Sequence, residues 1–300
     1  MSRFQIKPTS ASESLLLILS AKQLAWLDPR SPAQWHVVAL DARVEMAAAI
    51  SALTAIAVRH KTHGWPGVAP ATLCLAPDIT QHWLQTPPLQ TQSLKELHAV
   101  SSARAKTLFG PPQAHGEWSI SASWNASKAF LCTAISPTQV ALMATIAKTQ
   151  KELGLVCGLT LVLQKLEHLF PKNGWLAILL ADRFYIFQRQ QGVNLSIRTV
   201  RLPEQASLAS CEGLVFQEWQ REMIRTQNFT ENLYWLNTRP SMVLEPSRQS
   251  QQPSCKSKLH TLAWTTSGQT PKPSSASSDH ENILNCAWLT RELLGDRYAI

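Results

Sequence analysis

Three consecutive strand signals in residues 174–203 constrain the fold more than any other part of this chain. Trp175–Leu180 is an uninterrupted apolar run, and Phe184–Gln188 alternates around aromatic side chains. The turn signal Gln191–Asn194 then precedes a third, alternating stretch, Leu195–Leu202. Alternation with a period of two, broken by short polar connections, is typical of antiparallel strands joined by tight turns. The segment therefore predicts a three-stranded antiparallel unit.

A weaker copy of this pattern opens the chain. Leu15–Leu19, Lys22–Leu27 and Gln34–Leu40 predict three strands, and Val44–His60 predicts a helix because its apolar residues recur every three or four positions. The later copy is likewise followed by a predicted helix, Leu208–Arg225. The repeat predicts an α/β protein built from two hairpin-led units.

The elements between and after these copies are less regular. The sequence predicts a loop at Pro87-Pro88, a helix that Gly110 stops and a helix that begins with Ser136 as its N-cap. The full set of further predicted elements is a strand Thr72–Ala76, a helix Leu94–Phe109, a hairpin of Trp118–Trp124 with Ala129–Ala134, a helix from Pro137 to about Leu153, a strand Val156–Leu163, a helical turn Leu166–Phe170 and a strand Leu233–Leu236.

Composition changes after residue 240. In residues 241–280, 22 of 40 side chains are Ser, Thr, Pro or Gln, too few apolar groups to offset the entropy of ordering the segment. The predicted division is therefore a first subdomain of residues 1–135, a second of 136–240 and a disordered tail of 241–300. Within the tail, residues 282–294 fit either a short docking helix or a frayed terminus.

Charge and cysteine content narrow the class of protein. Charged residues make up only 16% of the chain, and the net charge of +8 is scattered rather than gathered in one run. Nucleic-acid-binding surfaces usually concentrate their cations, so we expect no nucleic acid partner. Six cysteines without a CxxC pair indicate reduced thiols, and the longest apolar runs fall short of the roughly 18 residues of a membrane span. These features predict a cytoplasmic protein.

Residues 15–225 resemble the actin-like ATPase superfamily. Leu73–Asp78 followed by Pro87-Pro88-Leu89 resembles the strand and Leu-Pro loop of its degenerate bacterial branch, and 175–203 resembles the second hairpin of that branch. The branch contains the type IV pilus assembly protein PilM and the cytoplasmic domain of the type II secretion protein GspL. The resemblance implies an actin-like, RNase H-like fold in which two αβ subdomains flank a cleft.

The two phosphate-binding turns of that superfamily are altered here. Such turns carry Asp and Gly, because glycine lets backbone amides approach phosphate. The first turn, Ser20–Gln23, has neither, and the second keeps Asp182 but has Phe184 where glycine is expected. We expect Phe184 to block the approach of phosphate and ATP turnover to be absent. Ser20, Lys22 and Asp182 are the candidate cofactor-binding residues of a vestigial nucleotide cleft, with no bound cofactor expected.

No other motif completes a site. The chain has no Gly-x-x-x-x-Gly-Lys loop, and His60 and His63 have ligand-like spacing but lack a local third ligand, for which Asp78 and His82 are only guesses. We therefore expect no metal and no catalytic residues.

The resemblance implies a non-catalytic cytoplasmic scaffold of a bacterial pilus or type II-like secretion assembly. Its partner would be a membrane-anchored assembly protein, with peripheral association at the inner membrane. Two alternatives stay open: a nucleotide-binding ATPase with atypical phosphate turns, and a nucleic-acid-associated basic protein. The sequence does not indicate the oligomeric state.

Overall fold

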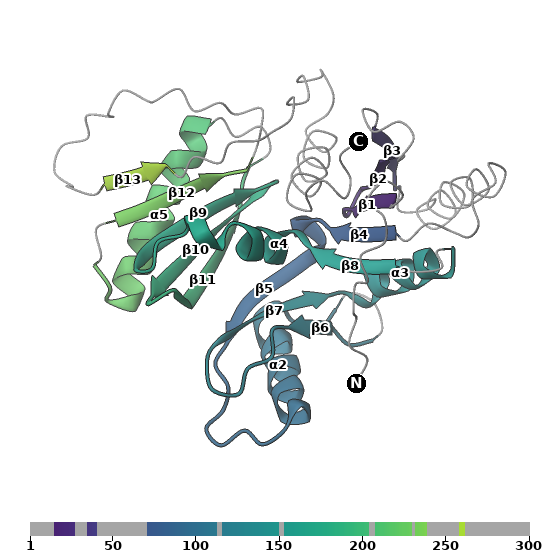
Figure 1. Ribbon diagram of the computed structural model, residues 1–300, viewed down its shortest axis with the longest axis horizontal. Coiled ribbons are helices and arrows are strands. Elements are labelled where there is room, and N and C mark those ends of the chain that lie inside the picture. The colour runs from purple at the N-terminus through teal and green to yellow at the C-terminus, as the bar shows by residue number, and fades with distance from the viewer. Residues whose placement is uncertain are drawn as a thin grey trace.

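In its described residues, the computed structural model of the chain contains two five-stranded sheets and one three-stranded sheet, which Figure 1 shows with their helices. The structure describes residues 15–27, 35–40, 71–112, 116–149, 153–203, 208–229, 232–238 and 258–261. The predicted helices Val44–His60 and 282–294 lie outside these residues.

The first sheet has the strand order β3-β2-β1-β4-β8. It consists of β1 (Leu15–Leu19), β2 (Gln23–Leu27), β3 (Trp35–Ala39), β4 (Ala71–Leu75) and β8 (Leu153–Cys157). The first three strands are antiparallel neighbours, whereas β1, β4 and β8 run parallel. All five residues of β1 are buried, as expected for a central strand covered on both faces.

The second sheet repeats this plan with the order β11-β10-β9-β12-β13. Its strands are β9 (Gly174–Leu180), β10 (Arg183–Gln190), β11 (Val193–Arg201), β12 (Asn232–Asn237) and β13 (Lys258–Thr261). Again the first three are antiparallel and β9, β12 and β13 run parallel. Two sheets with the same order and directions confirm the predicted α/β fold of two hairpin-led units.

The three-stranded sheet has the order β5-β7-β6 and is antiparallel throughout. It is made of β5 (Thr80–Gln85), β6 (Ser119–Ala122) and β7 (Phe130–Ile135), and it packs against α2 (Leu94–Phe109). A 3-10 turn, η1 (Pro77–Ile79), joins β4 to β5. Figure 1 shows β5 leading from the first sheet past β11, and these two strands contact each other.

The remaining helices lie beside the large sheets. They are α3 (Pro137–Thr149), α4 (Gly158–Lys165), the 3-10 turn η2 (Glu167–Leu169) and α5 (Leu208–Thr226). Residues of α3 join the core of the first sheet, while α4 and α5 pack on opposite faces of the second. The second sheet is therefore covered on both faces.

Local signals explain where two helices begin and end. The Ser93 side chain accepts a hydrogen bond from the backbone N–H of Glu96, and Glu96 reaches back to the N–H of Gln92, which together form a capping box for α2. Gly110 ends that helix with φ of +74°. Ser136 Oγ accepts from the N–H of Gln139, as expected for the N-cap of α3.

Strand alternation separates two cores in the second unit. Leu176, Ile178 and Leu180 of β9 point to the α4 side, while Trp175, Ala177 and Leu179 point to the α5 side. On β11, Ile197 and Val200 likewise contribute to opposite cores, as the sequence predicts.

Two sequence predictions for the middle of the chain are wrong. The predicted strand Val156–Leu163 ends at Cys157, where its partner β4 also ends, and α4 follows. The buried residues of α4 are Gly158, Leu159, Leu161 and Val162. One continuous apolar run therefore belongs partly to a strand and partly to a helix. The helix predicted to reach about Leu153 ends at Thr149 instead.

The predicted disordered tail contributes a strand. Lys258–Thr261 forms β13 and pairs in parallel with β12, in the place that β8 occupies in the first sheet. The other residues after Thr238 lie outside the described part of the chain. Strand β8 also pairs with the first sheet although it lies beyond the predicted boundary at residue 135. The division into 1–135, 136–240 and 241–300 itself stays a prediction.

Candidate functional site

The turn between β1 and β2, Ser20–Lys22, lies next to Asp78 of the β4–β5 connection. Its backbone closes through a hydrogen bond from the N–H of Ser20 to the carbonyl oxygen of Gln23. The Ser20 hydroxyl donates to the same carbonyl and accepts from the N–H groups of Lys22 and Gln23. Ser20 therefore stabilises the turn in place of a glycine.

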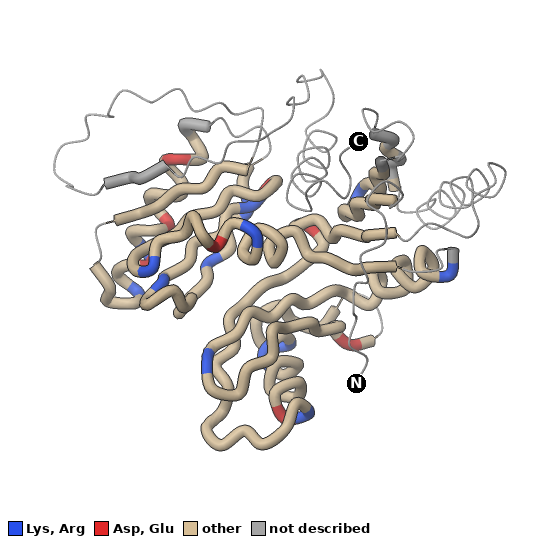
Figure 2. The backbone as a smooth tube through the Cα atoms, viewed as in Figure 1, with Lys and Arg blue, Asp and Glu red and all other residues tan. Residues whose placement is uncertain are grey.

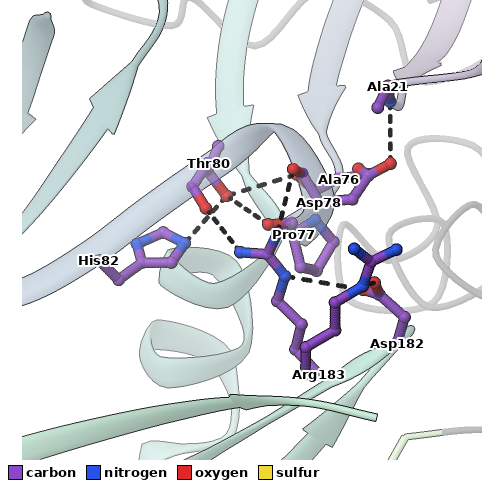
Figure 3. A network of polar contacts seen from close by, with 9 residues as sticks. Ala21, Ala76, Pro77, Asp78, Thr80, His82, Asp182 and Arg183 are labelled. Carbon is purple, nitrogen blue, oxygen red and sulfur yellow. Dashed lines mark hydrogen bonds and ion pairs between the residues drawn. The ribbon is translucent and has the colours of Figure 1, made fainter. Parts of the chain in front are cut away.

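Asp78 of η1 bonds to the backbone amide of Ala21, the remaining amide of this turn. Its Oδ2 accepts a hydrogen bond of 2.8 Å from the backbone N–H of Ala21, 57 residues earlier in the chain (Figure 3). A carboxylate on a backbone amide makes a strong, charge-assisted hydrogen bond. The chain thus places one of its own anions at the amide of the first hairpin turn.

Arg183 connects the second hairpin to the same place. The turn between β9 and β10 holds Ala181 at φ of +51°, and Arg183 follows directly as the first residue of β10. Its Nη1 donates to the carbonyl oxygen of Thr80 at 3.2 Å, and its Nη2 donates to that of Asp78 at 3.1 Å. Figure 3 shows this guanidinium reaching from the second unit to the β4–β5 connection of the first.

The two hydrogen bonds of Arg183 to these carbonyls are called the latch below. Asp182 lies beside the latch and is paired with two arginines. Its Oδ2 lies 3.3 Å from Nε of Arg201, and its Oδ1 lies 3.8 Å from Nε of Arg183. Arg201 is mostly exposed, whereas Asp182 and Arg183 are largely covered. Asp182 is thus held by cations of its own chain.

The pKa of Asp78 depends on its burial and on the charges around it, including that of Asp182. Burial raises the pKa of Asp78 from 3.8 to about 6; the hydrogen bond from Ala21 opposes this rise, the negative charge of Asp182 adds to it, and the positive charge of Arg183 counteracts it. Oδ1 of Asp78 is buried and has no hydrogen-bond partner among the described residues. The site therefore holds a carboxyl group that gains a proton close to neutral pH.

A buried polar cluster surrounds Thr80, one of the two residues whose carbonyl oxygens Arg183 contacts. Thr80 Oγ1 donates to the carbonyl oxygens of Ala76 and Pro77 and lies 3.0 Å from Nε2 of His82, whose Nδ1 lies 3.1 Å from Thr133 Oγ1. Burial, with a smaller effect of Arg183, lowers the pKa of His82 to about 3. The imidazole is therefore neutral and structural rather than a proton carrier at physiological pH.

The structure brings the sequence-predicted site residues to one location. Ser20 and Lys22 belong to the first turn and Asp182 to the second, and Asp78 links the two turns through its bond to Ala21 and its proximity to Asp182. Nucleotide binding at this location stays a prediction. Lys22 is exposed, and its carbonyl oxygen accepts from the N–H of Leu40.

The expectation for Phe184 is wrong. Its side chain is fully buried in the core on the α5 side of the second sheet, with Trp175 and Trp219, so it does not reach into the turn. Alternation along β10 explains this, because Arg183 and Phe184 point to opposite faces. Arg183, rather than Phe184, points toward the first unit, where it bonds to the carbonyl oxygens of Asp78 and Thr80.

Sequence reasoning missed Asp78 and Arg183 as site residues. In the sequence, Asp78 stands out only as the end of Leu73–Asp78 and as a possible third metal ligand, and no motif singles out Arg183. The available signal was position: Asp78 lies three residues after the buried strand β4 ends at Leu75, and sites in α/β folds gather at the ends of parallel strands. The 57-residue separation from Ala21 could not be read from the sequence.

The structure gives no support to a metal site or a membrane span within its described residues. No group of three or more His, Cys, Asp or Glu side chains that could hold a metal ion occurs there. His60 and His63 lie outside those residues. No described helix is long and apolar enough to cross a bilayer.

Comparison with known proteins gives matches in structure only. No family model and no curated protein matches the chain. A PilM–PilN type IV pilus biogenesis complex matches with a TM-score of 0.46 and 14% identity, over 75% of this chain and 81% of that chain. The cytoplasmic domain of EpsL, an inner-membrane component of the Vibrio cholerae type II secretion system, matches with a TM-score of 0.43 and 12% identity, over 94% and 98%. A Bacteroides thetaiotaomicron protein with an actin-like ATPase fold and unknown function matches with a TM-score of 0.42 and 10% identity, over 79% and 84%.

The likeness concerns the fold alone. These structures are of the kinds that the sequence resembles, and membership of the actin-like ATPase superfamily stays a prediction. All three TM-scores lie below 0.5, so these structures indicate neither the activity nor the partners of this chain.

Proposed function

We propose that this protein is a non-catalytic scaffold whose ancestral phosphate site is occupied by its own side chains. The observation that carries the proposal is the hydrogen bond from the Ala21 N–H to Asp78 Oδ2. In the superfamily that the sequence resembles, amides of this turn face a phosphate. Here a carboxylate of the same chain takes that position, so a phosphate would have to displace it and meet its charge.

Arg183 supports the same proposal. A mobile cleft needs two units that can move apart, whereas Arg183 spans them with two hydrogen bonds to backbone carbonyls. If the cleft opened, these carbonyls would exchange bonds to a charged donor for bonds to water, which costs about 1.5–3 kcal/mol for each bond. The arrangement favours a fixed orientation of the two units, which suits a protein that presents surfaces to others.

The partner that fits this role is a membrane-anchored protein of a bacterial pilus or type II-like secretion assembly. This part of the proposal comes from the resemblance of the sequence, because nothing in the geometry of the site identifies a partner. The scaffold would act in the cytoplasm, at the inner face of the membrane.

The test combines partner recovery with turnover. Full-length tagged protein, produced in the bacterium that encodes it, is isolated from detergent-treated membranes, and phosphate release from Mg-ATP is measured on the same sample. The expected result is recovery of a membrane-anchored assembly protein with no phosphate release above that of an Asp182→Ala control. Release that depends on Asp182, without a recovered partner, would favour the nucleotide-driven alternative.

A further inference from the structure

The last two turns of α5 expose an apolar side chain between two arginines. Ile224 lies three residues and Arg225 four residues after Arg221, so both lie on the same face of the helix as Arg221. Ile224 is 70% exposed, and Phe229, just past the helix end, is 67% exposed. Exposed apolar side chains that are grouped, rather than scattered singly, mark interaction sites.

Two buried glutamates hold the arginines of this region in place. Glu218 is 7% exposed and contacts Arg198 of β11 and Arg221, and Glu222 is 4% exposed and contacts Arg225. Nε of Arg225 donates to Glu222 Oε2 at 2.9 Å, and Nη2 donates to the same atom. Each guanidinium has five N–H donors, so these contacts fix its position and leave further donors for an outside anion.

The end of the helix is rigidly built. The N–H of Asn228 donates to the carbonyl of Met223, the N–H of Gln227 donates to that of Ile224, and Gln227 has φ of +53°. This is the Schellman arrangement, which satisfies the last carbonyls of a helix. The backbone that carries Ile224 and leads into Phe229 is therefore defined by hydrogen bonds.

We propose that this corner of α5, formed by Arg198, Arg221, Ile224, Arg225 and Phe229, docks the protein directly on a membrane surface rich in anionic lipid headgroups. Ile224 and Phe229 would enter the boundary between headgroups and acyl chains, while the arginines meet lipid phosphates. This docking role goes beyond the scaffold role, because the corner of α5 would contact lipid rather than the partner protein.

The combination of side chains favours lipid over an acidic protein segment. An acidic segment would pair with the arginines but would offer Ile224 and Phe229 no hydrocarbon. A bilayer offers both phosphates and hydrocarbon, at neighbouring depths. Figure 1 shows α5 at the left of the molecule, away from β1 to β8, so docking would leave the first unit accessible. Figure 2 shows cationic and anionic residues interspersed in the unit that contains α5.

The test is sedimentation of the full chain with vesicles of phosphatidylglycerol and phosphatidylethanolamine, compared with neutral phosphatidylcholine vesicles. The wild type is expected to sediment with the anionic vesicles and to be released by added salt. The double variant Ile224→Ser with Phe229→Ser should lower the partition coefficient about tenfold or more, because the apolar contribution of both side chains is lost. Both positions are exposed, and far-UV circular dichroism verifies that the variant is folded.

Two further variants make the result specific. Leu89→Ser removes a side chain that is 97% exposed in another part of the molecule and should leave vesicle binding unchanged. Glu222→Gln with Arg225→Gln removes an ion pair as a whole, so no buried carboxylate is left unpaired, and should weaken binding to anionic vesicles only.

Three outcomes would overturn the proposal: no sedimentation of the wild type with anionic vesicles, equal losses in the Leu89 and the Ile224–Phe229 variants, or binding of soluble polyglutamate in place of vesicles, which would indicate an acidic protein partner. None of these outcomes bears on ATP binding or on recovery of a membrane-anchored protein, so the scaffold proposal fails or survives separately.

Discussion

Asp78 is the residue on which the account of the site depends. Its carboxylate accepts from Ala21 in the first turn, lies close to Asp182 in the second, and belongs to the connection that Arg183 grips. Burying a carboxylate costs free energy that one hydrogen bond only partly offsets. The chain tolerates this cost at the junction of its two units, where the carboxylate fills an anion position.

A pH-dependent stability follows from this burial. The pKa of Asp78 is raised in the folded state, so the folded protein binds the proton more tightly than the unfolded chain does. The associated stability is fully present below about pH 4 and is lost as pH rises through about 6, by up to about 3 kcal/mol.

Asp78→Asn should remove this dependence, because an amide keeps the acceptor for Ala21 but carries no charge. Urea unfolding at pH 4, 6 and 7.5 measures the effect: the variant should match the wild type near pH 4 and exceed it at pH 7.5. A variant that is less stable than the wild type at pH 7.5 would show that the carboxylate charge stabilises the fold.

Arg183 should matter more than its neighbour Arg201. Arg183→Met leaves the carbonyls of Asp78 and Thr80 without their donor, and the expected loss is about 2–4 kcal/mol in the free energy of unfolding. Arg201→Met removes only a mostly exposed ion pair with Asp182 and should cost less than about 1 kcal/mol. Chemical denaturation of both variants compares them, and equal losses would mean that Arg183 does not act as a latch.

At the level of elements, the sequence pattern predicted the type of a helix or strand better than its boundaries. The three strands of residues 174–203 and helix α2 form where alternation and caps place them. The stretch 153–165 was misassigned, because an apolar run carries no period, and its change from β8 to α4 depends on where the partner β4 ends. Strand β5 was missed because its pattern is polar and short, and because one of the two partners of its buried His82 is Thr133 of β7, 51 residues later in the chain.

The end of α5 offers a test of backbone conformation. Gln227 has φ of +53°, a region that costs a non-glycine residue roughly 1 kcal/mol. Gln227→Gly should therefore stabilise the protein by a few tenths to about 1 kcal/mol, after the larger entropy of glycine in the unfolded chain is included. The matched control is Gln217→Gly within the same helix, which should destabilise by about 1 kcal/mol. Urea midpoints decide, and a destabilising Gln227→Gly would contradict the assignment of this helix end.

At the level of the whole molecule, duplication is the organising feature. The sequence predicts two hairpin-led units, and the identical strand orders of the two large sheets confirm this plan. The fifth strand of the second sheet could not be predicted, because it comes from a segment whose composition is typical of disorder. Its position follows from the fold, since β13 stands where β8 stands in the first sheet.

Removal of β13 should weaken the second unit. A chain that ends at residue 240 would leave the outer edge of β12 unpaired, and hydrogen exchange should show faster exchange of the β12 amides that bond to β13. A chain that ends at residue 265 keeps the strand and should exchange like the full protein. Unchanged protection in the shorter chain would mean that β13 does not pair stably with β12.

The central claim, that the chain fills its own phosphate position, is tested most directly by isothermal titration of the full-length protein with Mg-ATP. The account predicts no detectable heat of binding at high nucleotide concentration, for the wild type and for Asp182→Ala alike. Micromolar binding to the wild type that is lost in Asp182→Ala would contradict the account and establish a working nucleotide cleft.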